Sequence, residues 1–174
     1  MITILGISLT LMALVVPSVN VMLIRGKTTS SINRLVAAVN FIRHTAVQYH
    51  TVATLCATKS SGKYGASWAG KLSVFLDRNK NAKHEHEEKI IARISNNHSD
   101  TSVTWRAYQN KQYLQMTPTG YTKFQNGDFV VCPSNANPKY AHQIVINIQG
   151  RVRQNRSVNK AGYPIDRKGQ QLRC

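Results

Sequence analysis

The spacing of apolar positions predicts a long helix at the start of the chain. Residues 1–24, MITILGISLTLMALVVPSVNVMLI, are mostly apolar and contain no charged side chain. At about 1.5 Å per residue, an uncharged helix of this length spans the hydrocarbon core of a bilayer. We therefore expect residues 1–24 to form a membrane segment, in which lipid tolerates the interruption at Pro17.

The helical pattern continues over residues 25–49 and is clearest from about residue 29. Apolar residues recur there at spacings of three and four, and polar residues occupy the other face. The apolar set is Ile32, Leu35, Val36, Val39, Ile42 and Ala46. The sequence therefore predicts one continuous helix, whose first half lies in lipid and whose second half packs against a domain.

Residues 50–174 are predicted to form a β-rich head. Runs of β-branched and aromatic residues alternate with runs of turn-forming residues. The expected strands are 51–58, 71–77, 89–94, 101–108, 112–117, 127–132 and 142–148. Short strands at this spacing favour antiparallel sheets with hairpins, which gives an α+β fold. The last stretch, residues 157–174, has little to bury and is expected to be a tail.

The charge of the chain changes this picture. The 23 Lys and Arg residues outnumber the 7 Asp and Glu residues, for a formal net charge of +16. Self-repulsion opposes compaction, so such an excess indicates a polyanionic partner. Nucleic acid, anionic lipid and acidic polysaccharide all fit. Residues 139–174 hold eight basic residues against one acid, Asp166, so the charge is concentrated toward the C-terminus.

The strongest candidate site for that partner follows the last expected strand. Gly150 can let the backbone turn or approach a ligand closely, and Arg151 and Arg153 fall on the same side of an extended segment. Arginine donates two hydrogen bonds to one phosphate and stays charged. The other interpretation is a solvated strand end with scattered arginines. The candidate DNA-binding residues are Gly150, Arg151, Arg153, Arg156 and Lys160, with Lys139, Arg167, Lys168 and Arg173 as extensions if the tail folds back.

Three cysteines allow one disulfide. A bond between Cys132 and Cys174 closes a loop of about 43 residues, worth roughly 4 kcal/mol in the chain-entropy model. It requires an oxidising compartment and leaves Cys56 as a small core residue. The alternative is three reduced thiols in a cytosolic protein.

Residues 77–88, DRNKNAKHEHEE, have the spacing of a calcium-binding loop. Ala82 stands where that loop needs glycine, and Lys83 and His84 bring positive charge into it, so a plain hairpin loop is favoured and no metal is expected. A transition metal held by His84, His86 and a glutamate is the other interpretation. The candidate calcium ligands are Asp77, Asn79, Asn81, Glu85 and Glu88.

The sequence offers little for catalysis. No nucleophile elbow and no paired carboxylates can be recognised. Trp68 and Trp105 are most simply core or hairpin-packing residues. We therefore expect no enzymatic activity, no cofactor and no small-molecule substrate.

Five blocks, taken in order, carry a resemblance to a known family. They are LMALVVPS, NFIRHTAVQYHTVATLC, SWAGKLSVFLDRNKN, YLQMTPTGYTKFQNGDFVVCP and IVINIQGRVR, and together they cover nearly the whole chain. They resemble minor pilins and pseudopilins of the GspH and FimT type, which belong to type IV pili and type II secretion machines. The GRVR motif at residues 150–153 is most similar to the FimT branch, which is associated with DNA uptake in natural transformation.

The resemblance implies a type IV pilin-like fold, with a long N-terminal helix packed on an antiparallel β-sheet head. It implies anchoring in the bacterial inner membrane, a periplasmic head that becomes extracellular in a pilus, and DNA and other pilin subunits as partners. The alternative is a structural pseudopilin that primes or caps a pilus or secretion fibre without binding DNA.

The start of the chain departs from the family pattern. Family precursors begin with a short basic leader ending in glycine, followed by Phe-Thr-Leu and a glutamate before the apolar helix. Aligned on Pro17, Met1 falls just after that glutamate. We expect that the start has been placed at an internal methionine, because the leader supplies the basic residues on the cytoplasmic side that this chain otherwise lacks.

Overall fold

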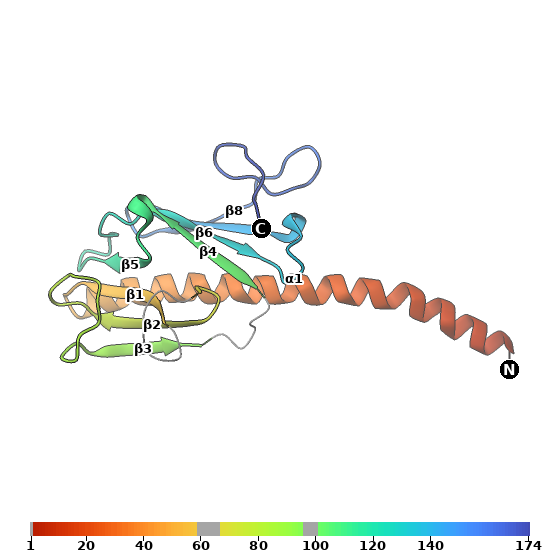
Figure 1. Cartoon of the computed structure of the whole chain (residues 1–174), viewed down its shortest axis with the longest axis horizontal. Coiled ribbons are helices and arrows are strands. Elements are labelled where there is room, and N and C mark those ends of the chain that lie inside the picture. Colours follow the sequence, from red (N-terminus) through yellow and green to blue (C-terminus); the bar gives the residue numbers. More distant parts are fainter. Residues whose placement is uncertain (1, 59–66, 96–100) are drawn as a thin grey trace.

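A computed structural model shows one long helix carrying a β-rich head (Figure 1). The structure describes residues 2–58, 67–95 and 101–174, with their side chains from residue 19 onward. Helix α1 spans Ile2–Gln48. Over these described residues, no helix is both long and apolar enough to cross a membrane, and the predicted membrane segment 1–24 lies mainly outside the described side chains.

The second half of α1 is the spine of the head. Leu35, Val39 and Ile42 lie on one face of the helix and are completely buried, as the periodicity predicts. On a neighbouring face, Arg34 donates hydrogen bonds of 2.8 Å to the carbonyl oxygens of Trp68 and Gly70. Burial lowers the pKa of this guanidinium. The helix is thus fixed to the head by an apolar stripe and one polar clamp.

Two four-stranded antiparallel sheets pack on this half of α1. The first has the order β3-β2-β1-β5 and the second has the order β4-β6-β7-β8. The strands of the first are β1 (Ala53–Thr58), β2 (Lys71–Leu76), β3 (Ile90–Ile94) and β5 (Tyr113–Met116). The strands of the second are β4 (Ser102–Ala107), β6 (Gly127–Cys132), β7 (His142–Ile146) and β8 (Val152–Asn155). Two short 3-10 helices, η1 (Tyr108–Asn110) and η2 (Pro138–Tyr140), lie in connections.

The predicted α+β fold is confirmed, and each of the seven expected strands is present. Strand β8 was not among them, because its sequence VRQN holds one apolar residue and carries no strand pattern of its own. It forms because β7 supplies an antiparallel partner in register, with Val145 opposite Arg153.

Aromatic side chains fill the space between the helix and the sheets. The ring centroid of Phe129 lies 4.3 Å from that of Trp105 and 5.0 Å from that of Trp68. Both tryptophans are buried, which agrees with the prediction that they are packing residues.

The C-terminal segment, expected to be a tail, folds back onto the second sheet. The predicted disulfide between Cys132 and Cys174 is present, with 5.6 Å between the two Cα atoms. Leu172 is buried against Val130 and Ala141 beside that bond. One apolar residue next to a covalent tie is therefore enough to hold a segment that is otherwise polar.

The cysteines give a direct test of this arrangement. Cys56 is buried and free, and burial raises the pKa of its thiol to about 12. Because the thiolate is the reactive form, we expect no reaction of the native, unreduced protein with a thiol reagent at pH 8. Unfolding in urea without reductant should release one reactive thiol per chain, measured by absorbance. Three reactive thiols under those conditions would show that the bond is absent.

Candidate nucleic-acid interface

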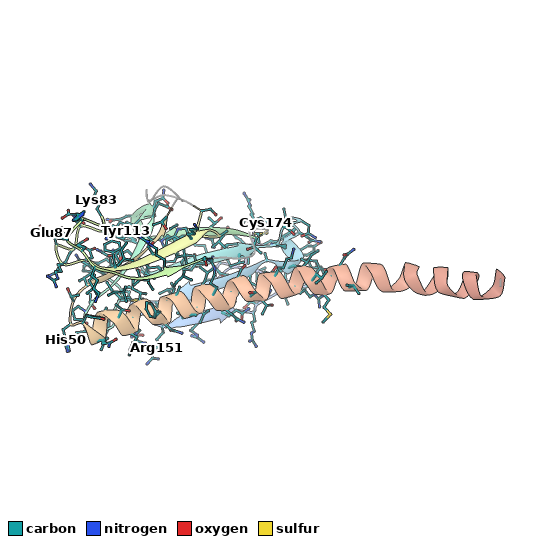
Figure 2. The ribbon with its side chains drawn as sticks, turned by 90° about the horizontal axis from the view of Figure 1, so that it is seen from below. His50, Lys83, Glu87, Tyr113, Arg151 and Cys174 are labelled. Atoms are coloured by element: carbon teal, nitrogen blue, oxygen red, sulfur yellow. A yellow bond between two sulfur atoms is a disulfide. The ribbon has the colours of Figure 1, made fainter. Side chains whose placement is uncertain are left out.

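The hairpin turn between β7 and β8 positions the first arginine. The Gly150 N–H donates to the Asn147 carbonyl oxygen at 3.0 Å, and the Arg151 N–H donates to Asn147 Oδ1 at 2.9 Å. Gly150 has φ of +70°, the left-handed conformation that closes a three-residue hairpin loop. The side chain of Arg151 therefore leaves the chain at a fixed point, near the end of the head away from the N-terminus (Figure 2).

The turn at residues 147–151 also packs tightly against the turn at residues 117–121. A Cβ atom built on Gly150 would lie 2.5 Å from the carbonyl oxygen of Gly120, which is closer than Cβ atoms in real proteins approach a neighbouring atom. The Thr122 N–H donates to the Ile148 carbonyl oxygen at 2.8 Å. The glycine predicted from the sequence is thus needed for packing as well as for turning.

The strand register decides where each arginine points. Arg153 lies opposite Val145, and Val152 lies opposite Ile146, which is buried toward the helix. Because side chains alternate along a strand, Arg153 faces outward. Arg151 directly precedes β8. Both side chains are exposed. That the two arginines share one side of an extended segment stays a prediction, because the register includes Arg153 but not Arg151.

Arg156 lies elsewhere. The pKa of His142 is lowered first by burial and then by the charge of Arg156, which places the two side chains near each other. His142 shares the helix-facing side of β7 with Ile144. Arg156 directly follows β8, and its charge acts on His142 and not on the outward face where Arg153 lies.

The folded-back segment presents further cations on two turns, which Figure 1 shows as two loops near the C-terminus. In one, Asn159 Oδ1 accepts backbone N–H groups of Ala161 and Tyr163, with Lys160 at the tip. In the other, Asp166 Oδ1 accepts those of residues 168 and 170, with Arg167 and Lys168 at the tip. The hydrogen bond from the backbone of residue 170 is the main cause that lowers the pKa of Asp166.

A sequence pattern that the predictions missed underlies these turns. Residues 117–121, 147–151, 159–163 and 166–170 each have Thr, Asn or Asp at the first position and Gly at the fourth. In each, the glycine N–H donates to the first carbonyl oxygen, and a first-position side-chain oxygen accepts a backbone N–H. All four glycines have positive φ. This repeated turn signature was available in the sequence.

The candidate cations are exposed and unpaired. Across the part of the chain that the structure describes, no ion pair joins a carboxylate to any of them. The eight side chains, called here the C-terminal basic cluster, are Lys139, Arg151, Arg153, Arg156, Lys160, Arg167, Lys168 and Arg173. Nearby, Arg106 differs, because its Nε donates to Asp128 Oδ2 at 3.0 Å.

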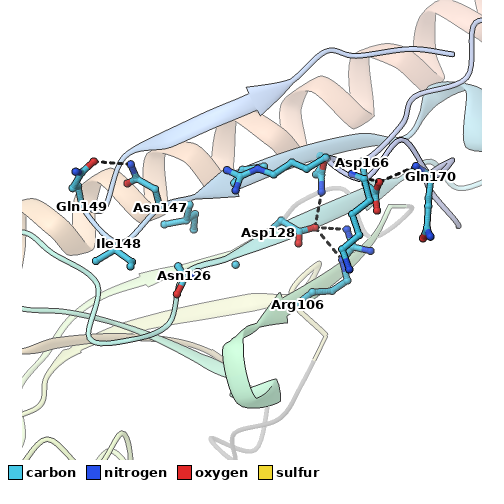
Figure 3. A pocket seen from close by; sticks show the side chains of 14 residues that line it. Arg106, Asn126, Asp128, Asn147, Ile148, Gln149, Asp166 and Gln170 are labelled. Atoms are coloured by element: carbon cyan, nitrogen blue, oxygen red, sulfur yellow. Dashed lines mark hydrogen bonds and ion pairs between the residues drawn. The ribbon is translucent and has the colours of Figure 1, made fainter.

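A groove of about 750 Å³ runs along the outer face of the second sheet (Figure 3). Asn126 and Ile148 lie at one end, and Asp166 and Gln170 lie at the other. Its walls also include Arg106, Gln143, Val145, Gln149, Arg167 and Lys168. Arg153 flanks it through its register with Val145. Cations and amide groups in one open groove can bind phosphate oxygens and polar edges of a flexible polyanion.

In the loop at residues 77–88, the candidate calcium ligands form hydrogen bonds with groups in and beside the loop. Asp77 is completely buried, and its Oδ2 accepts from Thr54 Oγ1 at 2.6 Å, from Gln115 Nε2 at 2.6 Å and from the Ala82 N–H at 2.9 Å. Among the described residues, no group of three or more His, Cys, Asp or Glu side chains is placed to hold a metal. The loop is a hydrogen-bonded hairpin between β2 and β3, and the expected absence of a metal stays a prediction.

Two other candidate ligands in this loop are also engaged. Glu88 accepts from the backbone N–H groups of Arg78 and Glu85, and Glu85 accepts from Asn81 Nδ2. His84 Nε2 lies 2.8 Å from the Glu88 carbonyl oxygen. These contacts direct the polar groups into the loop.

Comparison with known proteins gives a consistent set of matches. The family described as "Type II transport protein GspH" matches residues 31–150. The crystal structure of the type IV minor pilin FimU of Pseudomonas aeruginosa is similar at 16% identity and a TM-score of 0.56, covering 72% of this chain and 90% of that one. The minor pseudopilin EpsH from the type 2 secretion system of Vibrio cholerae is similar at 8% identity and a TM-score of 0.50, covering 74% and 95%. No curated protein matches the sequence.

Gly150 and Gly162 form a matched pair for testing the locked turn. Both have positive φ, but nothing lies within 4 Å of a Cβ built on Gly162. We expect Gly162→Ala to lower the free energy of unfolding by about 1 kcal/mol through backbone strain alone. Gly150→Ala should lower it by about 3 kcal/mol, because the carbonyl contact adds to the strain. Urea unfolding measures both, and equal losses would show that the turn is not locked.

The buried carboxylate of Asp77 gives a second stability test. Asp77→Ala leaves three donors without an acceptor and should lower the free energy of unfolding by about 3 kcal/mol. The exposed Glu87, in the same loop, is the control, and Glu87→Ala should change it by less than about 0.5 kcal/mol. The same melting measurement with calcium should show no shift in Tm, whereas a rise would support the calcium-binding interpretation.

Proposed function

Because the chain belongs to the GspH family of type II transport proteins, we propose that it is a minor pilin that binds DNA through its C-terminal basic cluster. Family and fold together make it a minor pilin or pseudopilin of a type IV pilus or type II secretion system, built to interact with other pilin subunits. It is a structural protein and not an enzyme. DNA binding is the step that the proposal adds.

One observation supports DNA binding above the others. Arg151 and Arg153 are exposed, carry no ion pair among the described residues, and leave a hairpin that Gly150 locks against the head. Because the backbone that carries these side chains is already ordered, binding phosphate orders only the two side chains and not the hairpin. The resemblance of the GRVR motif to FimT points in the same direction, and from it we infer a role in DNA uptake during natural transformation.

The expected binding does not depend on DNA sequence. Arginine and lysine side chains that contact phosphates fix a protein on DNA without reading bases. With about four to six phosphates neutralised, the logarithm of the binding constant should fall with the logarithm of salt concentration at a slope of roughly −4 to −5. Affinity per subunit is expected to be weak, and several copies in one fibre would strengthen it by avidity.

The proposal includes a place in the cell. Residues 1–24 anchor the chain in the bacterial inner membrane or the core of a pilus, residues 25–49 continue the helix, and residues 50–174 form the head. The head lies in the periplasm and becomes extracellular when the subunit is assembled. The bond between Cys132 and Cys174 agrees with an oxidising compartment.

A structural role without DNA is the second candidate, and α1 carries the observation that favours it. Val19, Met22 and Leu23 are exposed where the helix extends beyond the head. Apolar side chains on a free helix face are suited to packing against helices of neighbouring subunits. A pseudopilin that primes or caps a fibre needs such a face and does not need the basic cluster.

DNA titration separates the two candidates. The full chain in neutral detergent should bind unrelated DNA fragments, and binding should weaken with salt. Arg151→Gln with Arg153→Gln removes two phosphate contacts, so it should lower affinity about tenfold and make the salt slope shallower by about 1.8. Fluorescence anisotropy at several salt concentrations gives both quantities.

A charge-matched variant provides the control. Lys71→Gln with Arg93→Gln removes two exposed positive charges from the other sheet. This variant should keep its affinity within about twofold, since long-range attraction is screened at physiological salt. Equal losses of DNA affinity in both double variants would show that net charge alone causes the effect. A wild-type protein that does not bind DNA would favour the structural role.

A further inference from the structure

Phe124 combines two unfavourable features. Its φ of +62° lies in the left-handed region, which is an outlier for a bulky side chain. Its side chain is also 75% exposed, so no packing compensates for that backbone conformation. Strained residues cluster at functional sites, so the position of Phe124 is a reason to look for a function there.

Phe124 is not isolated. Tyr108 and Ile148 are 60% and 59% exposed, and Tyr121 is also exposed. We call these four residues, Tyr108, Tyr121, Phe124 and Ile148, the apolar rim.

Backbone hydrogen bonds bring the three loops of the apolar rim together. The Tyr108 N–H donates to the Asn126 carbonyl oxygen at 3.2 Å, two residues beyond Phe124. The Thr122 N–H, next to Tyr121, donates to the Ile148 carbonyl oxygen at 2.8 Å. Asn126 and Ile148 also lie together at one end of the groove (Figure 3). Of the apolar rim, Ile148 lines the groove itself, and the loops that carry the other three residues are bonded through their backbones to Asn126 and Ile148.

The surroundings of the apolar rim are basic and rich in amides. Lys123 adjoins Phe124, and its Nζ donates to the Lys80 carbonyl oxygen at 3.4 Å. Arg106 lies in the groove behind the rim. Of the two carboxylates that line the groove, Asp128 is engaged by Arg106 and by Gln143 Nε2, and Asp166 by backbone N–H groups of its own turn. The charge around the rim thus favours an anionic occupant.

We propose that the apolar rim is a stacking platform for unpaired DNA bases, whose phosphates lie along the groove and the C-terminal basic cluster. This inference rests on the proposed DNA binding and deepens it by naming single-stranded DNA, or the opened end of a duplex, as the preferred ligand. Aromatic rings beside a positive groove are the usual means of binding single strands without sequence preference. Duplex bases are stacked inside the helix, so they cannot use the platform.

The groove adds a second reason for an unpaired strand. Asn126 and Gln149 line it with exposed side-chain amides, which can both donate and accept hydrogen bonds. In a single strand the polar edges of the bases are free to pair with such groups. A ligand that offered only phosphates would bind the cations, and the amides of the groove would gain no hydrogen-bond partner from it.

The test compares a single-stranded thymidine oligonucleotide with a random-sequence duplex of equal length on the full chain in neutral detergent. Phe124→Gly removes the ring and suits the left-handed backbone, so the midpoint of urea unfolding should not fall. We expect a loss of about tenfold in affinity for the single strand and a change within about twofold for the duplex. Tyr49→Ala, an exposed aromatic beyond the end of α1, should change neither affinity.

The outcomes separate the two proposals. A single-strand affinity that Phe124→Gly leaves unchanged, or an equal loss for both ligands, would overturn the stacking platform and leave DNA binding intact. Failure of the wild-type protein to bind either DNA would overturn both. Loss of self-association in sedimentation, with single-strand affinity unchanged, would assign the rim to a contact between subunits and also overturn the platform.

Discussion

Burial of one apolar stripe of α1 against two antiparallel sheets is the interaction on which the rest of the structure depends. Leu35, Val39 and Ile42 are completely buried there, together with the inward residues Ile144 and Ile146 of β7. Because side chains alternate along a strand, fixing the inward set also fixes the outward set. The outward direction of Arg153 on β8 is therefore a consequence of core packing. A one-residue slip of β8 against β7 would turn Arg153 toward the helix.

The distribution of the acidic residues explains why the basic cluster is unpaired. Asp77, Glu85 and Glu88 bind groups within or beside their own loop, Asp128 binds Arg106, and Asp166 binds the backbone of its own turn. Each carboxylate thus satisfies a neighbour that would otherwise lack a partner. Among the described residues, these five acids are engaged locally, and the C-terminal basic cluster is left at the surface.

The parts of the fold that depend on periodicity were predictable from the sequence, and the parts that depend on contacts were not. The helix and seven strands each carry a regular apolar pattern, and the disulfide is one of few pairings that three cysteines allow. Strand β8 is formed by its neighbour, and the fold-back of residues 157–174 depends on Leu172 and one covalent bond. Arg156 follows the last residue of β8, Asn155, so no strand pattern in the sequence gives the direction of its side chain. The conformation of Phe124 is set by the loops around it, because a phenylalanine does not favour positive φ by itself.

The proposed contacts contribute to the free energy of DNA binding in two ways, which respond differently to salt and to base pairing. Contacts between the basic cluster and phosphates release counterions, so their contribution falls as salt rises, more steeply for duplex than for single-stranded DNA, and does not depend on base sequence. Stacking on the apolar rim buries uncharged surface, so it depends little on salt and distinguishes unpaired bases from paired ones. As salt rises, the phosphate contribution shrinks while the stacking contribution stays. The preference for single strands is therefore carried mainly by Phe124 and its neighbours, while attraction from a distance comes from the arginines.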